Sequence, residues 1–205
     1  MLDPVVLFFI MGVVAGLAKS DLKVPESFYN VLSIYLLLAI GIKGGMELQK
    51  TGLHQIALPA LAAIGLGLAT SSITYVISSK LAKLDFDNAV ALSAHYGSVS
   101  AVTFAVAIST LKSKHIYYEE YMTVLLVMME IPAIVFAIGF YKWRKNSNQV
   151  HFGKIVKEVF MGKSILLLTG GLLIGMYIQN THNSQMNLFF FDLFKGFLSI
   201  FMLEM

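Results

Sequence analysis

AVALSAHYGSVSAVTFAVAISTL, which occupies Ala89–Leu111, is the segment from which the architecture of this chain can be inferred. It is long and apolar enough to cross a lipid bilayer as a helix. Its middle nevertheless carries a histidine, a glycine and several hydroxyl side chains where hydrocarbon is expected. Polar groups at that depth are costly and tend to mark substrate pathways in membrane proteins. The segment therefore predicts a membrane span with a specialised, interrupted centre.

The composition of the whole chain is typical of an all-α membrane protein. Of its 205 residues, 57% are hydrophobic and only 13% are charged, whereas about 25% of the residues of a soluble domain are charged. The net charge of +3 is small, and the basic residues lie between apolar segments. This pattern favours membrane orientation over nucleic-acid binding. The chain has no cysteine, which excludes disulfides and thiolate metal sites.

Seven apolar segments are predicted to span the bilayer as transmembrane helices. They are about Asp3–Ala18, Pro25–Gly44, Gln55–Leu81, Ala89–Leu111, Tyr121–Tyr141, Ser164–Gln179 and Leu188–Met205. The fold class that we expect is therefore all-α, a polytopic protein of the cell membrane.

The segments fall into two groups with a weak internal likeness. Gly12–Gly16 in the first span and Gly171–Gly175 in the sixth share the same glycine spacing, and each precedes a polar break and an aromatic-rich span. Because five spans separate the copies, the second copy would be inverted, a common transporter plan. We expect a complete five-helix repeat in residues 1–145, a basic cytoplasmic loop in residues 146–163, and the first two helices of an incomplete second repeat in residues 164–205.

The basic residues of the connecting loops predict the orientation. Loops on one side hold four: Lys43, Lys50, Lys112 and Lys114. Loops on the other side hold ten: Lys19, Lys23, Lys80, Lys83, Lys142, Arg144, Lys145, Lys154, Lys157 and Lys163. Cytoplasmic loops carry the excess of Lys and Arg, so the second side should be cytoplasmic and the amino terminus should lie outside.

A break in the fourth span would create a binding site from main-chain groups. If the helix breaks near Gly97–Val99, the next half-helix begins around Ser100 and points free amides into the gap. A helix end carries about half a positive charge and holds an anion without Lys or Arg. The carbonyls that end the preceding half-helix, with nearby hydroxyls, suit a hard cation such as sodium. The candidates are Tyr96, Gly97, Ser98, Val99, Ser100, Ala101 and Thr103 for the anion, and Ser93, Ser98 and Thr103 for sodium.

The same residues also allow other interpretations. In an unbroken helix, Ser93, Gly97 and Ser100 would form a stripe that packs against a neighbouring helix. His95 is either a packing residue that bonds a carbonyl or part of a proton relay. Glu130 either gates, relays protons or is simply protonated and hydrogen-bonded.

An enzyme is the remaining alternative, because a serine and a histidine lie close together in the fourth span. A serine hydrolase needs a histidine from a different, neighbouring helix to activate the serine. His95 and Ser98 are on the same helix, and the other histidines lie in or beside loops: His54, His115, His151 and His182. We therefore expect no enzyme activity.

Three segments carry a resemblance to a known family. Leu2–Leu17, Gly41–Glu47 (GIKGGME) and above all Ser93–Phe104 (SAHYGSVSAVTF) resemble the sodium-dependent bicarbonate transporters of cyanobacteria and other bacteria. Glu130–Pro132 and the basic loop after the fifth span fit as well. The resemblance covers the whole chain, which corresponds to the amino-terminal part of a typical family member.

The resemblance implies a sodium–bicarbonate symporter with two inverted five-helix repeats, usually a homotrimer. It implies a core domain with two crossing broken helices, a gate domain, sodium as the coupling ion and no further cofactor. In cyanobacteria a PII-like regulatory protein binds from the cytoplasmic side. Only the first broken helix can be placed on this chain, so Tyr96–Thr103 is the implied half-site.

Two classes of function therefore stay open. The chain is either a transporter, or the amino-terminal part of one, or it is a non-transporting membrane fragment or half-subunit that assembles with a partner. On the first hypothesis the ligands are bicarbonate and sodium, although the half-helix would also suit another small anion. On both hypotheses the lipid bilayer is the surrounding medium.

The orientation is testable because the chain has no native cysteine. A single cysteine at Asn148 should react with a membrane-impermeant maleimide only from the cytoplasmic side, since ten of the loop bases lie on that side. A cysteine at Lys114 is the control and should react in intact cells. Labelling at Asn148 in intact cells would contradict the predicted orientation.

Overall fold

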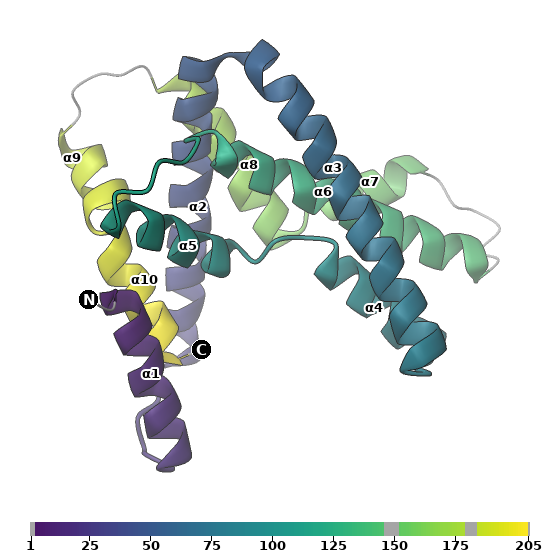
Figure 1. Ribbon diagram of the computed structural model, residues 1–205, viewed down its shortest axis with the longest axis horizontal. Helices are drawn as coiled ribbons and strands as arrows, with labels where there is room; N and C mark the ends of the chain where they lie inside the picture. The colour runs from purple at the N-terminus through teal and green to yellow at the C-terminus, as the bar shows by residue number, and fades with distance from the viewer. Residues whose placement is uncertain (1–2, 146–151, 179–183, 205) are drawn as a thin grey trace.

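The computed structural model describes residues 3–145, 152–178 and 184–204, and its regular elements in these ranges are all helices (Figure 1). The longer helices are α1 (Pro4–Leu17), α2 (Glu26–Thr51), α3 (Leu53–Val76), α4 (Phe86–Tyr96), α5 (Ala101–Ser113), α6 (Met122–Arg144), α7 (Phe152–Phe160), α8 (Lys163–Tyr177) and α10 (Phe194–Glu204). The short helix α9 (Ser184–Asn187) and two π-helical turns, η1 (Ile77–Leu81) and η2 (Leu188–Asp192), complete the described part. The predicted all-α class is confirmed there.

Four stretches are long and apolar enough to cross a membrane. They are Glu26–Thr51, His54–Leu81, Phe86–Ser113 and Met122–Arg144. α1 and α8 are apolar but shorter. With 14 residues, α1 is about 21 Å long, less than the roughly 30 Å of a bilayer core. The number of spans, predicted to be seven, therefore stays a prediction.

Several element boundaries differ from those predicted. α2 continues past Gly44 to Thr51, because its glycines lie at helix contacts rather than at a helix end. The last predicted span is divided into η2 and α10, and the short helix α9 precedes it. The predicted loop 146–163 contains the helix α7, whereas its residues 146–151 lie outside the described ranges. Gln179 and Met205, where two of the predicted spans end, also lie outside them.

The helices α2 and α8 touch through their main chains. Gly41 and Gly45 of α2 face Gly171 and Gly175 of α8, four residues apart on each helix. A Cβ atom on Gly171 would lie 2.9 Å from the carbonyl oxygen of Leu38, and one on Gly45 or Gly175 would overlap a main-chain carbonyl oxygen of the facing helix. Small residues at this spacing let two membrane helices approach closely.

α1 and α10 make a similar contact beside this pair. Gly12 of α1 lies against the main chain of Leu203, where a Cβ atom would overlap the carbonyl oxygen. Aromatic rings join α10 to α2: Tyr29 stacks on Phe201 with ring centroids 4.5 Å apart, and Tyr35 contacts Phe197 at 4.6 Å. The helices α1, α2, α8 and α10 therefore form one packed group, which we call the α2 group (Figure 1).

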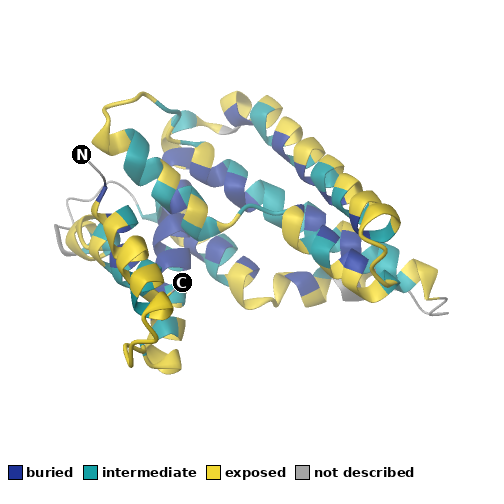
Figure 2. Cartoon of the chain, turned by 60° about the horizontal axis from the view of Figure 1, so that its bottom comes forward, coloured by how far each residue is buried: buried dark blue, intermediate teal, exposed yellow. Residues whose placement is uncertain are grey.

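The helices α3, α4 and α6 form a second group, which we call the α3 group. Its chain leaves α2 through Gly52, whose φ of 78° is a conformation that side chains with a Cβ atom rarely adopt. α6 also contacts α2, so the two groups touch. Large apolar residues are exposed, including Leu58 at 77% and Leu17 at 81%. Figure 2 shows that exposed positions run along the outer helices. Exposed apolar surface on this scale fits a lipid surrounding.

The α2–α8 contact can be tested with two glycines of α8, one inside the contact and one outside it. Gly175→Ala should lower the free energy of unfolding by about 1 to 3 kcal/mol, because the added methyl group has no space against Ile42. Gly170→Ala is the matched control: nothing lies within 4 Å of a Cβ atom there, so helix propensity should leave stability unchanged or slightly raised. Thermal unfolding in lipid nanodiscs measures both. Equal effects of the two substitutions would contradict the described contact.

Candidate functional site

The fourth predicted span is interrupted. α4 ends at Tyr96 and α5 begins at Ala101, and the residues between them, Gly97–Ser100, form no regular element. The predicted break within residues 96–102 is confirmed, and the alternative of an unbroken helix is wrong. The two half-helices do not stack end to end, since α4 packs in the α3 group and α5 contacts α2 and α10 (Figure 1).

Hydroxyl side chains satisfy much of the backbone that the break exposes. The Ser98 hydroxyl donates to the carbonyl of His95 at 3.2 Å, and the Gly97 amide donates to the carbonyl of Ser93 at 3.1 Å. At the start of α5, the Ser100 hydroxyl accepts from the amide of Thr103 at 3.3 Å, which is an N-cap. Non-helical backbone at membrane depth needs such partners.

Gly97 lies in a contact between helices rather than in open space. It is buried, and a Cβ atom on it would lie 2.7 Å from the Cβ atom of Ala133 in α6 and 2.8 Å from that of Ser71 in α3. Only glycine fits this position without displacing a neighbour. The absent side chain therefore allows the end of α4 to pack closely against α3 and α6, which is a different use from the substrate contact predicted for it.

Ser93 is directed into the same contact. Its side chain is 2% exposed, and its hydroxyl donates to the carbonyl of Val90 at 2.8 Å. Its own carbonyl accepts both the Ser71 hydroxyl at 2.8 Å and the Gly97 amide at 3.1 Å. The predicted role of Ser93 as a sodium ligand stays a prediction, and its carbonyl is already fully used in this arrangement.

The other predicted residues lie on both sides of the break. Tyr96 is 62% exposed, and its ring meets that of His95 edge to face at 5.6 Å. Ser100 and Thr103 are exposed, whereas Val99 packs against the hydrophobic core. Ala101, with its neighbour Val102, lines a small cavity of about 120 Å³ between α5, α2, α8 and α10. In the described part, the predicted anion and sodium residues are not gathered around one common cavity.

Main-chain groups remain available at the break. The amides of Ala101 and Val102 have no acceptor among the described residues, because Ser100 caps only Thr103. These amides are at the positive end of α5, where an anion is favoured. On the other side, the carbonyls of Ala94 and Tyr96 accept no hydrogen bond within the described ranges. The break therefore offers donors to an anion and oxygen atoms to a cation.

Two further residues have proposed polar roles. Glu130 is half-buried in α6, and no hydrogen bond of the described part reaches its carboxyl group. The His95 side chain is exposed and bonds no carbonyl among the described residues. The roles of both residues in gating or proton relay stay predictions.

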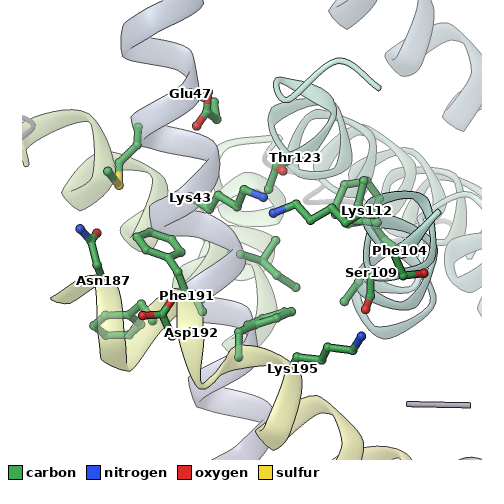
Figure 3. Close-up of a pocket in the computed structure, with 18 of the residues that line it drawn as sticks. Lys43, Glu47, Phe104, Ser109, Lys112, Thr123, Asn187, Phe191, Asp192 and Lys195 are labelled. Carbon is green, nitrogen blue, oxygen red and sulfur yellow. The ribbon is translucent and has the colours of Figure 1, made fainter. Parts of the chain in front are cut away.

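A larger cavity was not predicted. Its volume is about 750 Å³, and it lies between α2, α5, α6, η2 and α10 (Figure 3). Lys43 and Lys112, which the sequence placed in loops, instead lie in α2 and α5 and line this cavity. Their positions toward the same ends of two predicted spans are the signal that could have placed them together.

The membrane-length helices and the break identify the general class of this protein. Membrane-length helices, one of them interrupted between two half-helices that end in free main-chain groups, are the features of a membrane-integral transport protein. Comparison with known families identifies which one. The chain belongs to the Na⁺-dependent bicarbonate transporter superfamily, whose family model matches residues 4–205. The resemblance noted in the sequence is thereby confirmed, whereas a search of curated proteins gives no match.

The capping role of Ser100 can be measured directly. Ser100→Ala should lower the free energy of unfolding by about 1 kcal/mol, because the Thr103 amide loses its acceptor at the start of α5. Ser113→Ala is a suitable control, since its hydroxyl donates to a carbonyl in the last turn of the same helix and caps no amide. Chemical unfolding in detergent micelles compares them. A loss at Ser113 equal to that at Ser100 would contradict the capping role.

Proposed function

We propose that this chain acts in sodium-dependent bicarbonate symport across the cell membrane, and that the break at Gly97–Ser100 supplies one half of the substrate site. The observation that carries the proposal is the pair of helix ends at the break, within a chain that belongs to this transporter superfamily. The expectation that the chain is no enzyme rests on the same membership.

The chemistry of the two helix ends supports coupled binding of an anion and a cation. The amides of Ala101 and Val102 suit the oxygen atoms of bicarbonate, as backbone amides at a helix start suit anions generally. The hydroxyls of Ser98 and Thr103, with the carbonyl of Tyr96, suit sodium, since a hard cation takes oxygen ligands. Each ion would neutralise the other, so each would bind more tightly when its partner is present. This mutual dependence is what symport requires.

The Ser100 hydroxyl competes with the anion for one amide of the half-site. Its hydroxyl occupies the Thr103 amide, which is the third amide of α5 and part of the predicted anion site. An arriving anion would exchange with this hydroxyl rather than meet a fully open helix end. The cap would therefore stabilise the empty site and reduce the cost of releasing the anion.

The helix contacts support the proposed inverted repeat. Gly12 of α1 packs on the carbonyl of Leu203 in α10, and Gly171 of α8 packs on the carbonyl of Leu38 in α2. If α1 corresponds to α8 and α2 to α10, a two-fold rotation exchanges one contact for the other. Inverted repeats related in this way are a common plan of secondary transporters. The division into residues 1–145 and 164–205 remains our proposal.

One interrupted helix is present in the described residues, so they supply one half-site. Alternating access also needs a second repeat that moves against the first. The alternative function is therefore a half-subunit that assembles with a partner, or a non-transporting membrane fragment. A transporter of another small anion is also consistent with main-chain amides, which do not distinguish bicarbonate from other anions by themselves.

We make three further proposals, which rest on the resemblance and on the distribution of basic residues. They are a homotrimer, an external amino terminus and a PII-like regulator that binds on the cytoplasmic side.

Uptake of labelled bicarbonate tests the proposal. In cells without bicarbonate transport of their own, the 205-residue chain alone should not concentrate bicarbonate. A fusion of the chain to the carboxy-terminal half of a family transporter should do so, and only with sodium outside. In that fusion, Ser98→Ala should raise the sodium concentration needed for half-maximal uptake or abolish uptake, because the cation loses an oxygen ligand.

Ser72→Ala in the same fusion is the matched control. The Ser72 hydroxyl is exposed and donates to the carbonyl of Leu68 within α3, and Ser72 is not among the predicted ion ligands, so the sodium requirement should not change. Strong sodium-driven uptake by the chain alone would contradict the half-site. An unchanged sodium requirement in Ser98→Ala would show that the cation lies elsewhere.

A further inference from the structure

The large cavity between α2 and α5 has a concentration of positive charge that the break does not use. Four lysines line its wall: Lys43, Lys50, Lys112 and Lys195. Two of them are neutralised by carboxylates. Lys50 pairs with Glu47 at 3.0 Å, and Lys195 pairs with Asp3 at 2.9 Å. The remaining two, Lys43 and Lys112, form no ion pair with a carboxylate among the described residues.

Lys43 and Lys112 approach each other from different helices. Lys43 projects from α2 and Lys112 from the last turn of α5, and Figure 3 shows their ammonium groups turned toward one another. Two carboxylates, Glu47 and Glu120, act on Lys43 from beyond ion-pair distance, and Asp192 also lines the cavity. Thr123, a buried residue of α6, lines the same part of the cavity.

Two ammonium groups in this position repel each other, and more strongly in a cavity wall than in water, because the surrounding protein screens charge poorly. An anion between them removes the repulsion and gains hydrogen bonds from both. An anion with several oxygen atoms can accept from Lys43, Lys112 and the Thr123 hydroxyl at once, which a single-atom anion cannot do. Charge-assisted hydrogen bonds of this kind are the stronger ones in proteins.

We propose that Lys43 and Lys112 form a binding site for a small oxyanion such as bicarbonate or a carboxylate, separate from the helix break. Lys112 lies 11 residues beyond Ala101 along α5, so the two sites are about 16 Å apart on the same helix. The cavity is much larger than a small oxyanion, so the ion occupies the corner between the lysines and water fills the rest. Binding at this site does not depend on transport.

Anion titration of the purified chain in nanodiscs tests the site. Potassium bicarbonate and, separately, potassium formate are added in a sodium-free potassium chloride buffer, because chloride is a single-atom anion and cation coupling at the break is not engaged. The chain should bind both anions, bicarbonate and formate. Lys43→Gln and Lys112→Gln should each weaken binding at least tenfold, whereas Lys43→Arg, which keeps the charge, should bind within a few-fold of the unchanged chain.

Two control variants locate the anion. Lys50→Gln removes a lysine of the same cavity that already has a carboxylate partner, and Ser98→Ala alters the break. Lys50→Gln should bind bicarbonate as the unchanged chain does. No binding by the unchanged chain, or equal binding by Lys50→Gln, Lys43→Gln and Lys112→Gln, overturns the proposal. A tenfold loss in Ser98→Ala without one in the lysine variants assigns the anion to the break and also overturns it.

The stability of the protein without an added oxyanion supplies a second measurement. If the two ammonium groups repel each other, Lys43→Met should raise the unfolding temperature in potassium chloride buffer and should remove the further rise that bicarbonate causes. If Lys43 were instead held by a carboxylate, the same substitution would lower the unfolding temperature. A fall therefore overturns the proposal, even if one of the glutamine variants fails to fold.

Discussion

The backbone contact between α2 and α8 is the interaction on which the rest of the structure depends. In a membrane there is little hydrophobic gain from bringing two apolar helices together, so close packing must supply the attraction. Glycines at the same spacing on both helices allow the two main chains to touch. Once α2 is held in this way, α10 packs on it through Tyr29 and Tyr35, and α5 lies across it to enclose the cavity that Lys43 and Lys112 line. The α3 group joins this assembly through α6.

The break in the fourth span follows from a different constraint, which is that main-chain groups need partners wherever water is scarce. Gly97 permits the close contact with α3 and α6, and the hydroxyls of Ser98 and Ser100 replace bonds that a continuous helix would have made. The residues at the break therefore have two uses. Some of them close off backbone groups, and the amides left over at Ala101 and Val102 are the ones available to a ligand.

Local sequence predicted the features that depend on local chemistry. The break could be predicted because a glycine among hydroxyls within an apolar span disfavours an unbroken helix, and the four membrane-length stretches could be located from apolar runs. The extension of α2 through Gly44 and Gly45 was missed, because a glycine pair resembles a helix end until its contacts are known. α7 was missed because it is a short helix that itself contains several charged residues. The approach of Lys43 to Lys112 depends on how α5 crosses α2, and no local pattern contains that information.

The four residues from Gly97 to Ser100 also connect the two groups of helices, since α4 packs in the α3 group and α5 against the α2 group. If one group slides against the other, the half-helices move with their own groups and the torsion angles of this linker must change. Those same torsion angles set the direction in which the amides of α5 and the carbonyls of α4 point. The linker would then act as a hinge that converts relative motion of the helices into a change of ligand geometry, so that affinity at the break and the position of the two groups vary together.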